Sequence, residues 1–200
     1  MPDRRRAGNG PGTRGDRGGG PAAQGRPLNP RPLSRYAFRP AARADLPMLA
    51  RWLGTPDAMR WWGDPAEQYE LLAGDLDEPR MAMRIVSFQG RPFAYAQHYE
   101  VHAWPQPHLA ALPAGSRAID TFIGEPGMLG IGHGAAYLHA LAAALRVAGA
   151  PFVAVDPHRD NARARRAYAK AGFRGDAVVE TAEGPAVVMI YADDARLRTT

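Results

Sequence analysis

The chain has 200 residues, of which 46% are hydrophobic, which is enough to bury the core of one domain. It contains no cysteine, and this excludes disulfide bonds, thiolate metal sites and cysteine nucleophiles. The net charge is +5, but eight arginines and only two aspartates lie within residues 1–35, so the rest of the chain is close to neutral and no nucleic-acid-binding face is expected on it.

Residues 1–34 are dominated by Gly, Pro and Arg. Such a segment buries too little apolar surface to offset the entropy of ordering, so we expect a disordered extension. An arginine-rich arm that binds RNA is the alternative, although no aromatic residue stands between the arginines to stack on bases. No secretory signal is recognised, and no run approaches the ~20 apolar residues of a membrane span, so a cytoplasmic protein without membrane contact is expected.

A folded domain is expected over residues 35–195, followed by a short tail over residues 196–200, because the composition changes abruptly at Tyr36. In its first half, helices are predicted over residues 45–53 and 65–72, with Trp61 to Asp64 between them. Strands are predicted over residues 36–39, 81–88, 93–101 and 117–124, with a hairpin turn at Gln89-Gly90.

The second half alternates strands and helices. Leu138, Leu141 and Leu145 form one apolar stripe, which predicts a helix over residues 132–148. A second helix is predicted to end at Gly172, and it covers residues 161–171. Strands are predicted over residues 151–155, 173–179 and 186–191, the last two joined by a turn near Glu183-Gly184. We therefore expect an α/β domain with a mixed sheet.

A glycine-rich turn joins the predicted strand over residues 117–124 to the predicted helix over residues 132–148. It consists of Leu129, Gly130, Ile131, Gly132, His133 and Gly134. Glycine lets the backbone approach a ligand closely, and the N–H groups at the start of a helix attract anions, so a pyrophosphate would fit here. A tight turn without a ligand is the alternative. The spacing matches neither a Walker loop nor a dinucleotide-binding turn.

A second segment supports a ligand-binding role for this turn. Residues 156–173 read DPHRDNARARRAYAKAGF, which resembles the coenzyme A-binding helix of the GNAT superfamily of N-acetyltransferases. The resemblance covers about residues 36–192, although Leu129 stands where the family usually carries Gln or Arg. It implies a GNAT fold, in which helices flank a central mixed, mostly antiparallel sheet and splayed middle strands form a groove for acetyl-CoA. It also implies that the glycine turn, Asn161 and Tyr168 bind this cofactor.

Within the superfamily the chain is similar to the aminoglycoside 6′-N-acetyltransferases. The shared features are Trp61-Trp62-Gly63, Tyr95-Ala96-Gln97, Ile119-Asp120, Asp156-Pro157 and residues 183–187. The resemblance implies acetyl transfer to a primary amine of a small cationic substrate. Siderophore-pathway acyltransferases acting on hydroxylysine, or other small-amine acetyltransferases, are the alternatives, but the siderophore enzymes carry histidine in place of Asp120. A CoA-sensing or RNA-binding protein is the non-enzymatic alternative.

Asp120 is the candidate catalytic base. Strand alternation places it on one face with Ala118 and Phe122, in partly apolar surroundings that would raise the pKa of its carboxyl group. An amine of pKa ~10 costs roughly 4 kcal/mol to deprotonate at pH 7, so a base there would be useful. The alternative is a carboxylate that pairs with Arg117 or only binds the substrate's ammonium group.

Tyr168 is the candidate general acid, because a phenol of pKa ~10 stays protonated at pH 7 and can donate to a departing thiolate. The alternative is an ordinary core tyrosine. By resemblance Asn161 would bind the pantetheine, and it also fits the N-cap of its helix.

The substrate's ammonium groups should meet acidic and aromatic side chains. Candidates beyond Asp120 are Trp61, Trp62, Gln97, Asp156 and Glu183, with Asp64, Glu67 and Glu100 as further wall residues. The loop over residues 103–116 contains no acidic residue, whereas typical aminoglycoside enzymes carry several there. The identity of the amine substrate is therefore left open. The six histidines show no ligand spacing, so no metal is expected. A monomer or a homodimer is expected.

Overall fold

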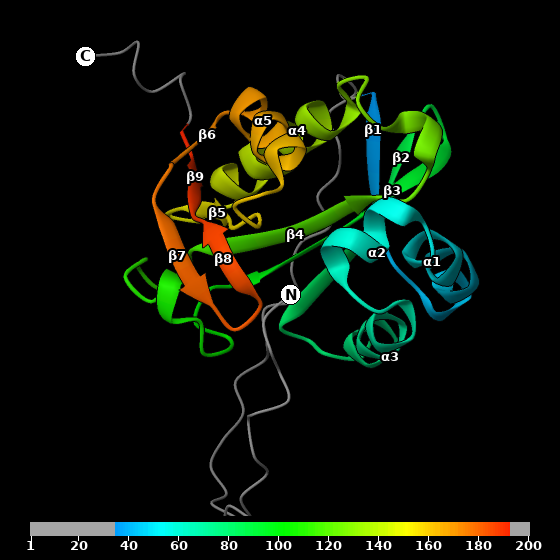
Figure 1. Ribbon diagram of the computed structural model, residues 1–200, viewed down its shortest axis with the longest axis horizontal. Coiled ribbons are helices and arrows are strands. Elements are labelled where there is room, and N and C mark those ends of the chain that lie inside the picture. Colours follow the sequence, from blue (N-terminus) through cyan, green and yellow to red (C-terminus); the bar gives the residue numbers. More distant parts are fainter. Residues whose placement is uncertain (1–34, 193–200) are drawn as a thin grey trace, which may run out of the picture.

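A seven-stranded mixed sheet runs through the domain in the computed structural model, which describes residues 35–192 (Figure 1). The strands lie in the order β1-β2-β3-β4-β5-β9-β6. Their bounds are Tyr36–Pro40 (β1), Met81–Phe88 (β2), Arg91–Glu100 (β3), Arg117–Ile123 (β4), Val153–Val155 (β5), Phe173–Arg174 (β6) and Met189–Tyr191 (β9). Only β4 and β5 are parallel among these neighbours, so the predicted mostly antiparallel sheet is confirmed. The extension over residues 1–34 and the tail over residues 196–200 lie outside the described residues.

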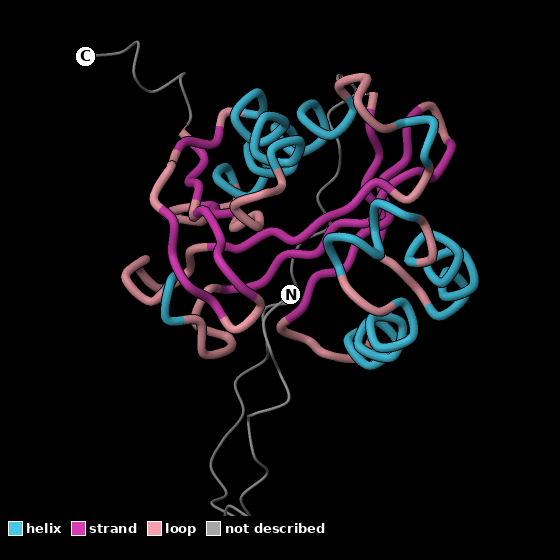
Figure 2. Tube along the Cα trace, viewed as in Figure 1, coloured by secondary structure: helices cyan, strands magenta, loops and turns pink. Residues whose placement is uncertain are grey.

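Helices cover both faces of this sheet (Figure 2). One face carries α4 (His133–Val147) and α5 (Ala162–Ala171), and the other carries α1 (Leu46–Leu53), α2 (Pro56–Trp62) and α3 (Pro65–Asp75). Short 3-10 turns occupy Arg43–Asp45 (η1), Pro107–Leu109 (η2) and Pro126–Met128 (η3). A separate hairpin is formed by β7 (Val178–Thr181) and β8 (Gly184–Val187). Among the described helices, none has the length and apolar character needed to cross a membrane.

Two apolar clusters hold the helices to the sheet. Beneath α4 the stripe of Leu138, Leu141 and Leu145 is buried, as its spacing predicts. On the opposite face, Leu49, Trp52, Leu53 and Leu72 belong to the second cluster. Burying each such side chain contributes about 1.5–3 kcal/mol, and this burial fixes α1 and α3 on the sheet.

Helix α2 was not predicted, and the prediction that Trp61 to Asp64 lies between helices is wrong for Trp61 and Trp62, which belong to α2. The helix is only seven residues long, so the sequence offers too few turns for a periodic apolar stripe. The available signal was at its ends: Pro56 stands at its first position, and Gly63 follows it with a φ of 93°. Proline at the start and glycine after the end are the usual boundaries of a helix.

The two strands predicted over residues 173–179 and 186–191 are each divided. β6 and β9 stay in the main sheet, whereas β7 and β8 leave it as the separate hairpin. The two segments approach each other closely at the division, because a Cβ atom on Gly175 would lie 2.2 Å from the carbonyl oxygen of Val188. The run over residues 186–191 is apolar without interruption, so the sequence pattern did not show the second break, whereas Gly175-Asp176 is a turn signal at the first.

The middle of the sheet opens between β4 and β5. Their ladder joins Arg117 to Val153 and Ala118 to Ala154, and beyond it β4 continues to Ile123 paired with β3 only. The predicted splay of the middle strands is thereby confirmed, and β4 residues beyond Ala118 are free to face a ligand.

Substitution of Gly124 by alanine is expected to destabilise the fold. A Cβ atom there would lie 2.1 Å from ring atoms of Trp52, whose side chain is buried and whose Nε1 donates to Glu125 at 2.7 Å. Overpacking of this kind costs about 1–3 kcal/mol, so the urea midpoint should fall. Gly127→Ala is the matched control, because its Cβ would meet nothing within 4 Å. Equal midpoints for the two variants would contradict the expectation.

Candidate active site

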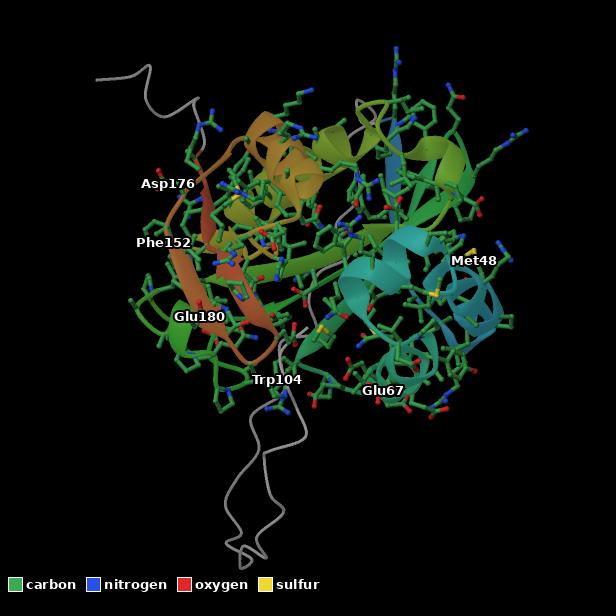
Figure 3. All side chains as sticks on the ribbon, in the orientation of Figure 1. Met48, Glu67, Trp104, Phe152, Asp176 and Glu180 are labelled. Carbon is green, nitrogen blue, oxygen red and sulfur yellow. The ribbon has the colours of Figure 1, made fainter. Side chains whose placement is uncertain are left out.

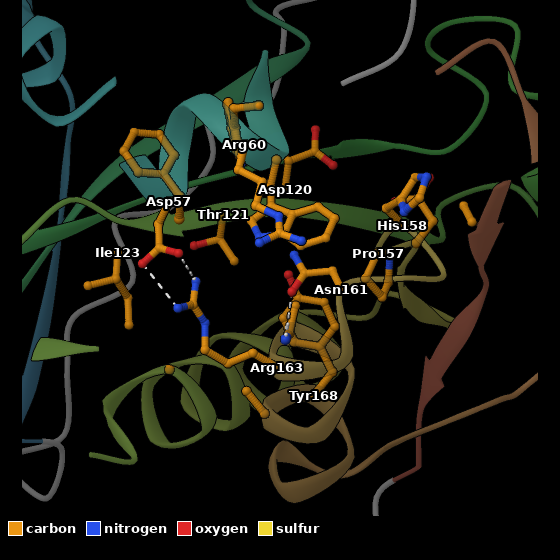
Figure 4. A pocket seen from close by; sticks show the side chains of 18 of the residues that line it. Asp57, Arg60, Asp120, Thr121, Ile123, Pro157, His158, Asn161, Arg163 and Tyr168 are labelled. Carbon is orange, nitrogen blue, oxygen red and sulfur yellow. Dashed lines mark hydrogen bonds and ion pairs between the residues drawn. The ribbon is translucent and has the colours of Figure 1, made fainter. Parts of the chain in front are cut away.

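A cleft of about 1260 Å³ opens where β4 and β5 separate (Figure 4). Its walls come from β4, the glycine turn, α2, α5 and the turn between β7 and β8. Because α5 and α2 lie on opposite faces of the sheet, the cleft connects the two faces. Most of the predicted site residues line it: Trp61, Trp62, Asp120, Asp156, Asn161, Tyr168 and Glu183.

The glycine turn forms one rim of this cleft. Gly130 and Gly132 have φ values of 76° and 96°, and Gly132 is the N-cap of α4. The first N–H groups of a helix lack partners within it, and its dipole favours a negative group there. Leu129, Gly130, Gly132 and Gly134 line the cleft. The N–H of Leu129 already donates to the carbonyl oxygen of Pro126 at 3.1 Å, so the donors offered to an anion are those that follow it in the turn.

Two side chains of the same turn point elsewhere. Ile131 is 66% exposed and does not line the cleft. His133 turns toward the core, where its Nδ1 lies 2.8 Å from the hydroxyl oxygen of Tyr36 and its ring lies 4.5 Å from that of Phe88. At both positions only the backbone is therefore available to a bound phosphate.

Asp120 stands on β4 just beyond the point where β5 separates. Its Oδ2 accepts a hydrogen bond from Nε2 of Gln97 at 2.8 Å, and Oε1 of Gln97 accepts one from the Tyr95 hydroxyl at 2.7 Å. Gln97 is completely buried, so it meets Asp120 rather than the cleft. The predicted alternative partner, Arg117, lies an odd number of residues away and points to the opposite face.

The surroundings of Asp120 give its carboxyl group an unusual pKa. Burial raises this pKa to about 6, and the charges of Asp156 and Glu183 add to the rise while the hydrogen bond from Gln97 opposes it. A carboxylate of this kind is ionised at neutral pH and is still basic enough to accept a proton.

Helix α5 presents Asn161 and Tyr168 to the cleft (Figure 4). Oδ1 of Asn161 accepts from the N–H of Ala164 at 3.0 Å, which confirms the N-cap, and Gly172 ends the helix with a φ of 103°. Burial raises the pKa of Tyr168 well above its ordinary value, and the charges of Tyr137, Asp120 and Asp156 raise it further. The phenol therefore keeps its proton at neutral pH.

Two further polar residues in the cleft were not predicted. Thr121 Oγ1 donates to the carbonyl oxygen of Tyr95 at 2.5 Å, and it lies 2.7 Å from the hydroxyl oxygen of Tyr137. Both Thr121 and Tyr137 line the cleft. The contact joins α4 to β4 across 16 residues of sequence, and no local motif marks it.

The opposite wall combines aromatic rings with carboxylates. Trp62 packs edge-on against Phe122 at 4.7 Å, and Trp61 lies 5.8 Å from the His158 ring. Asp156 follows β5, and Glu183 stands in the turn between β7 and β8. Asp120, Asp156 and Glu183 all line the cleft, and the charges of Asp156 and Glu183 act on Asp120, so the structure gathers three carboxylates. Such a set suits a cationic guest.

Three other acids considered from the sequence do not line the cleft. Oδ1 of Asp64 caps α3 by accepting from the N–H groups of Ala66 and Glu67. Glu67 itself lies on the outer surface of α3 (Figure 3). Glu100 accepts from the N–H groups of His102 and Gly115. The carboxylates of Asp64 and Glu100 are used for a cap and a turn, which short sequence motifs could have indicated.

An ion pair spans the cleft from α2 to α5. Arg163 NH2 lies 2.7 Å from Oδ1 of Asp57, and NH1 donates to Oδ2 at 3.0 Å (Figure 4). The pair joins the helix that carries Trp61 to the helix that carries Tyr168. Within residues 35–192, no group of three or more His, Asp or Glu side chains could hold a metal ion.

Comparison with known proteins gives one consistent family. Residues 41–181 match the acetyltransferase (GNAT) domain. The chain is 33% identical over 171 residues to aminoglycoside N(6′)-acetyltransferase type 1 of Klebsiella pneumoniae, covering 78% of this chain and 82% of that protein. A kanamycin resistance protein of Rhizobium radiobacter is 37% identical over 86 residues, which is 42% of this chain and 80% of that protein.

Solved structures agree with the sequence matches. A complex of AAC(6′)-Ib with paromomycin and acetyl-CoA has a TM-score of 0.72 and 30% identity, over 82% of this chain and 97% of that chain. A complex of the same enzyme with coenzyme A and kanamycin has a TM-score of 0.72 and 30% identity, over 82% of this chain and 98% of that chain. The chain therefore belongs to the GNAT acetyltransferase family.

Proposed function

We propose that the protein transfers the acetyl group of acetyl-CoA to the 6′-amine of an aminoglycoside. The observation that carries this proposal is the pairing, in one cleft, of a carboxyl group of pKa about 6 on Asp120 with a protonated phenol on Tyr168. The 33% identity to an aminoglycoside N(6′)-acetyltransferase supports the choice of acceptor.

The residues of the cleft fit acetyl-CoA as the acetyl donor. The glycine turn would hold its diphosphate through backbone N–H groups, and Cβ atoms on Gly130 or Gly132 would meet nothing within 4 Å, so the space above the turn is open. The side-chain oxygen of Asn161 is used by the helix cap, which leaves its nitrogen to donate to the pantetheine. When bound, acetyl-CoA supplies a thioester whose carbonyl carbon is attacked and whose sulfur departs.

Asp120 and Tyr168 would move the protons of this reaction. Oδ1 of Asp120 accepts a proton from the ammonium group of the acceptor, which exposes the nitrogen lone pair inside the cleft, and the ~4 kcal/mol cost of deprotonating an alkyl amine at pH 7 remains part of the barrier. The nitrogen then forms its bond to the acetyl carbon as the bond from that carbon to sulfur breaks. Tyr168 donates its hydroxyl proton to the sulfur, and a second proton lost from the nitrogen restores the phenol.

The acceptor is positioned by the remaining cleft residues. Asp156 and Glu183 bind further ammonium groups, while the faces of Trp61 and Trp62 bound the sugar rings. Gln97 contributes indirectly, because it holds the Asp120 carboxylate in one orientation.

The decisive experiment compares two aminoglycosides that differ only at position 6′. Neomycin carries an amine there and paromomycin a hydroxyl, so thiol release from acetyl-CoA should be observed with neomycin and be at least about 100-fold slower with paromomycin. Mass spectrometry of the product should show one added acetyl group. Equal rates with the two compounds would place the acetyl group on another amine and contradict the 6′ assignment.

Acetylation of a smaller amine is the second candidate, and one observation favours it. The loop over residues 103–116 carries no carboxylate, so fewer acids are available to a large polycation than in typical aminoglycoside enzymes. Turnover of hydroxylysine or spermidine without turnover of neomycin would select this candidate. Binding of acetyl-CoA without turnover of any amine would instead support a CoA-sensing role.

A further inference from the structure

The loop over residues 103–116, which contains no acidic residue, places a histidine beside Asp156, one of the three carboxylates that line the cleft. Nε2 of His108, in η2, lies 2.8 Å from Oδ2 of Asp156, which stands directly after β5. The two residues are 48 positions apart, and their side chains are only 10% and 24% exposed. The contact was not predicted, since the sequence shows His108 only as one of several scattered histidines.

The turn that carries His108 is anchored to the core. Its neighbour Leu109 is 1% exposed and belongs to the apolar cluster beneath β3 and β4. Gln106, immediately before η2, donates from Nε2 to the hydroxyl oxygen of Tyr99 at 2.9 Å, and both residues are buried. The imidazole is therefore presented by a fixed segment, so it can restrain the carboxylate that it contacts.

The contact leaves one oxygen of Asp156 for a ligand. Asp156 lines the cleft together with Asp120 and Glu183, whereas His108 does not line it. An imidazole N–H directed at Oδ2 fixes the plane of the carboxylate, and Oδ1 remains as an acceptor for a cation in the cleft. Asp120 is the proposed base for the reacting amine, so Asp156 is available for a different ammonium group of the same molecule.

We infer that His108 is a positioning residue that orients Asp156 to bind a second, non-reacting ammonium group of the acceptor. This inference rests on the proposed function and deepens it: the acceptor carries at least two amines, one facing Asp120 and one held by Asp156. His108 acts through Asp156 and touches neither the reacting amine nor the acetyl donor.

The first test separates substrate binding from chemistry. His108→Ala should raise the KM for neomycin about tenfold or more, because a hydrogen bond to a charged group is lost, while kcat and the KM for acetyl-CoA change less than about twofold. His108→Asn, whose amide can still donate, should recover part of the affinity. His102→Ala is the matched control: this histidine lies beside Glu100 with 42% of its side chain exposed, and its loss should change neither constant.

A double-mutant cycle tests whether His108 affects substrate binding through Asp156. Asp156→Asn alone should raise the KM for neomycin, and adding His108→Ala to it should raise KM no further, since the partner has already lost its charge. Calorimetric titration of neomycin into the CoA-saturated protein should show the same pattern in Kd, independently of turnover. Additive effects, or a fall in kcat without a change in KM, would overturn the inference.

Failure of the proposed function gives a different result from failure of the positioning role. If the wild-type protein acetylates spermidine or hydroxylysine but not neomycin, the aminoglycoside proposal is wrong, and the same cycle run with the accepted diamine decides the role of His108. A wild-type protein that neither acetylates nor binds any of these amines would overturn both.

Discussion

Replacement of Asp120 by asparagine is expected to lower kcat/KM for the acceptor amine by about 1000-fold at about pH 7.5. The amide has the same shape as the carboxylate but cannot accept a proton, so the amine must lose its proton without help. Burial raises the pKa of Asp120 to about 6, which is still below neutral pH, so the wild-type carboxyl group is ionised and active as a base there. Initial rates of thiol release from acetyl-CoA, measured with each protein at subsaturating neomycin, give the ratio directly.

The pH dependence of kcat/KM provides a second test of the role of Asp120. Protonation inactivates a base, so the wild-type kcat/KM should fall as the pH is lowered through about 6, and Asp120→Asn should lack this limb. Asp77→Asn is the control, because Asp77 pairs with Arg43 on the exposed surface away from the cleft. Calorimetry should find acetyl-CoA binding unchanged in both variants. An unchanged kcat combined with a raised KM for neomycin in the asparagine variant would assign Asp120 to binding alone, and an unchanged kcat/KM would exclude both roles.

Local patterns were sufficient to predict the elements that hold the donor side of the cleft. The stripe of Leu138, Leu141 and Leu145 predicted α4 to within a residue at each end, because an amphipathic helix repeats its apolar positions over several turns. The caps at Asn161 and Gly172 likewise predicted α5, since capping depends on the first and last turns only. The position of Asp120 beside apolar neighbours followed from strand alternation.

Contacts between segments far apart in the sequence could not be predicted in the same way. The pairs His108 with Asp156 and Asp57 with Arg163 form because loops and helices meet around the splayed strands, and neither pair has a local motif. Helix α2 was missed because it is short, and the separation of β8 from β9 was missed because the apolar run over residues 186–191 continues through it. Tertiary packing, not residue pattern, decides each of these features.

Replacement of Tyr168 by phenylalanine is expected to lower kcat about 100-fold while the KM for each substrate changes less than about twofold. The ring remains to pack against Phe173 at 6.1 Å, so the main loss is the proton donor. The effect should be smaller than that of Asp120→Asn, because a thiol has a pKa near ~8.5 and its thiolate can leave partly unassisted, whereas an alkyl ammonium group cannot attack at all.

The control for this variant is Tyr69→Phe, which removes a phenol from α3 outside the cleft and should leave kcat unchanged. Burial raises the pKa of Tyr168 well above its ordinary value, so the wild-type enzyme should show no loss of kcat from ionisation of this phenol up to about pH 9. The Tyr168→Phe variant should be slower throughout that range. An unchanged kcat combined with a lower urea midpoint would assign Tyr168 to the core. A parallel fall in kcat and in acetyl-CoA affinity would instead make its hydroxyl a binding group, and the proton would then have to reach the sulfur from water.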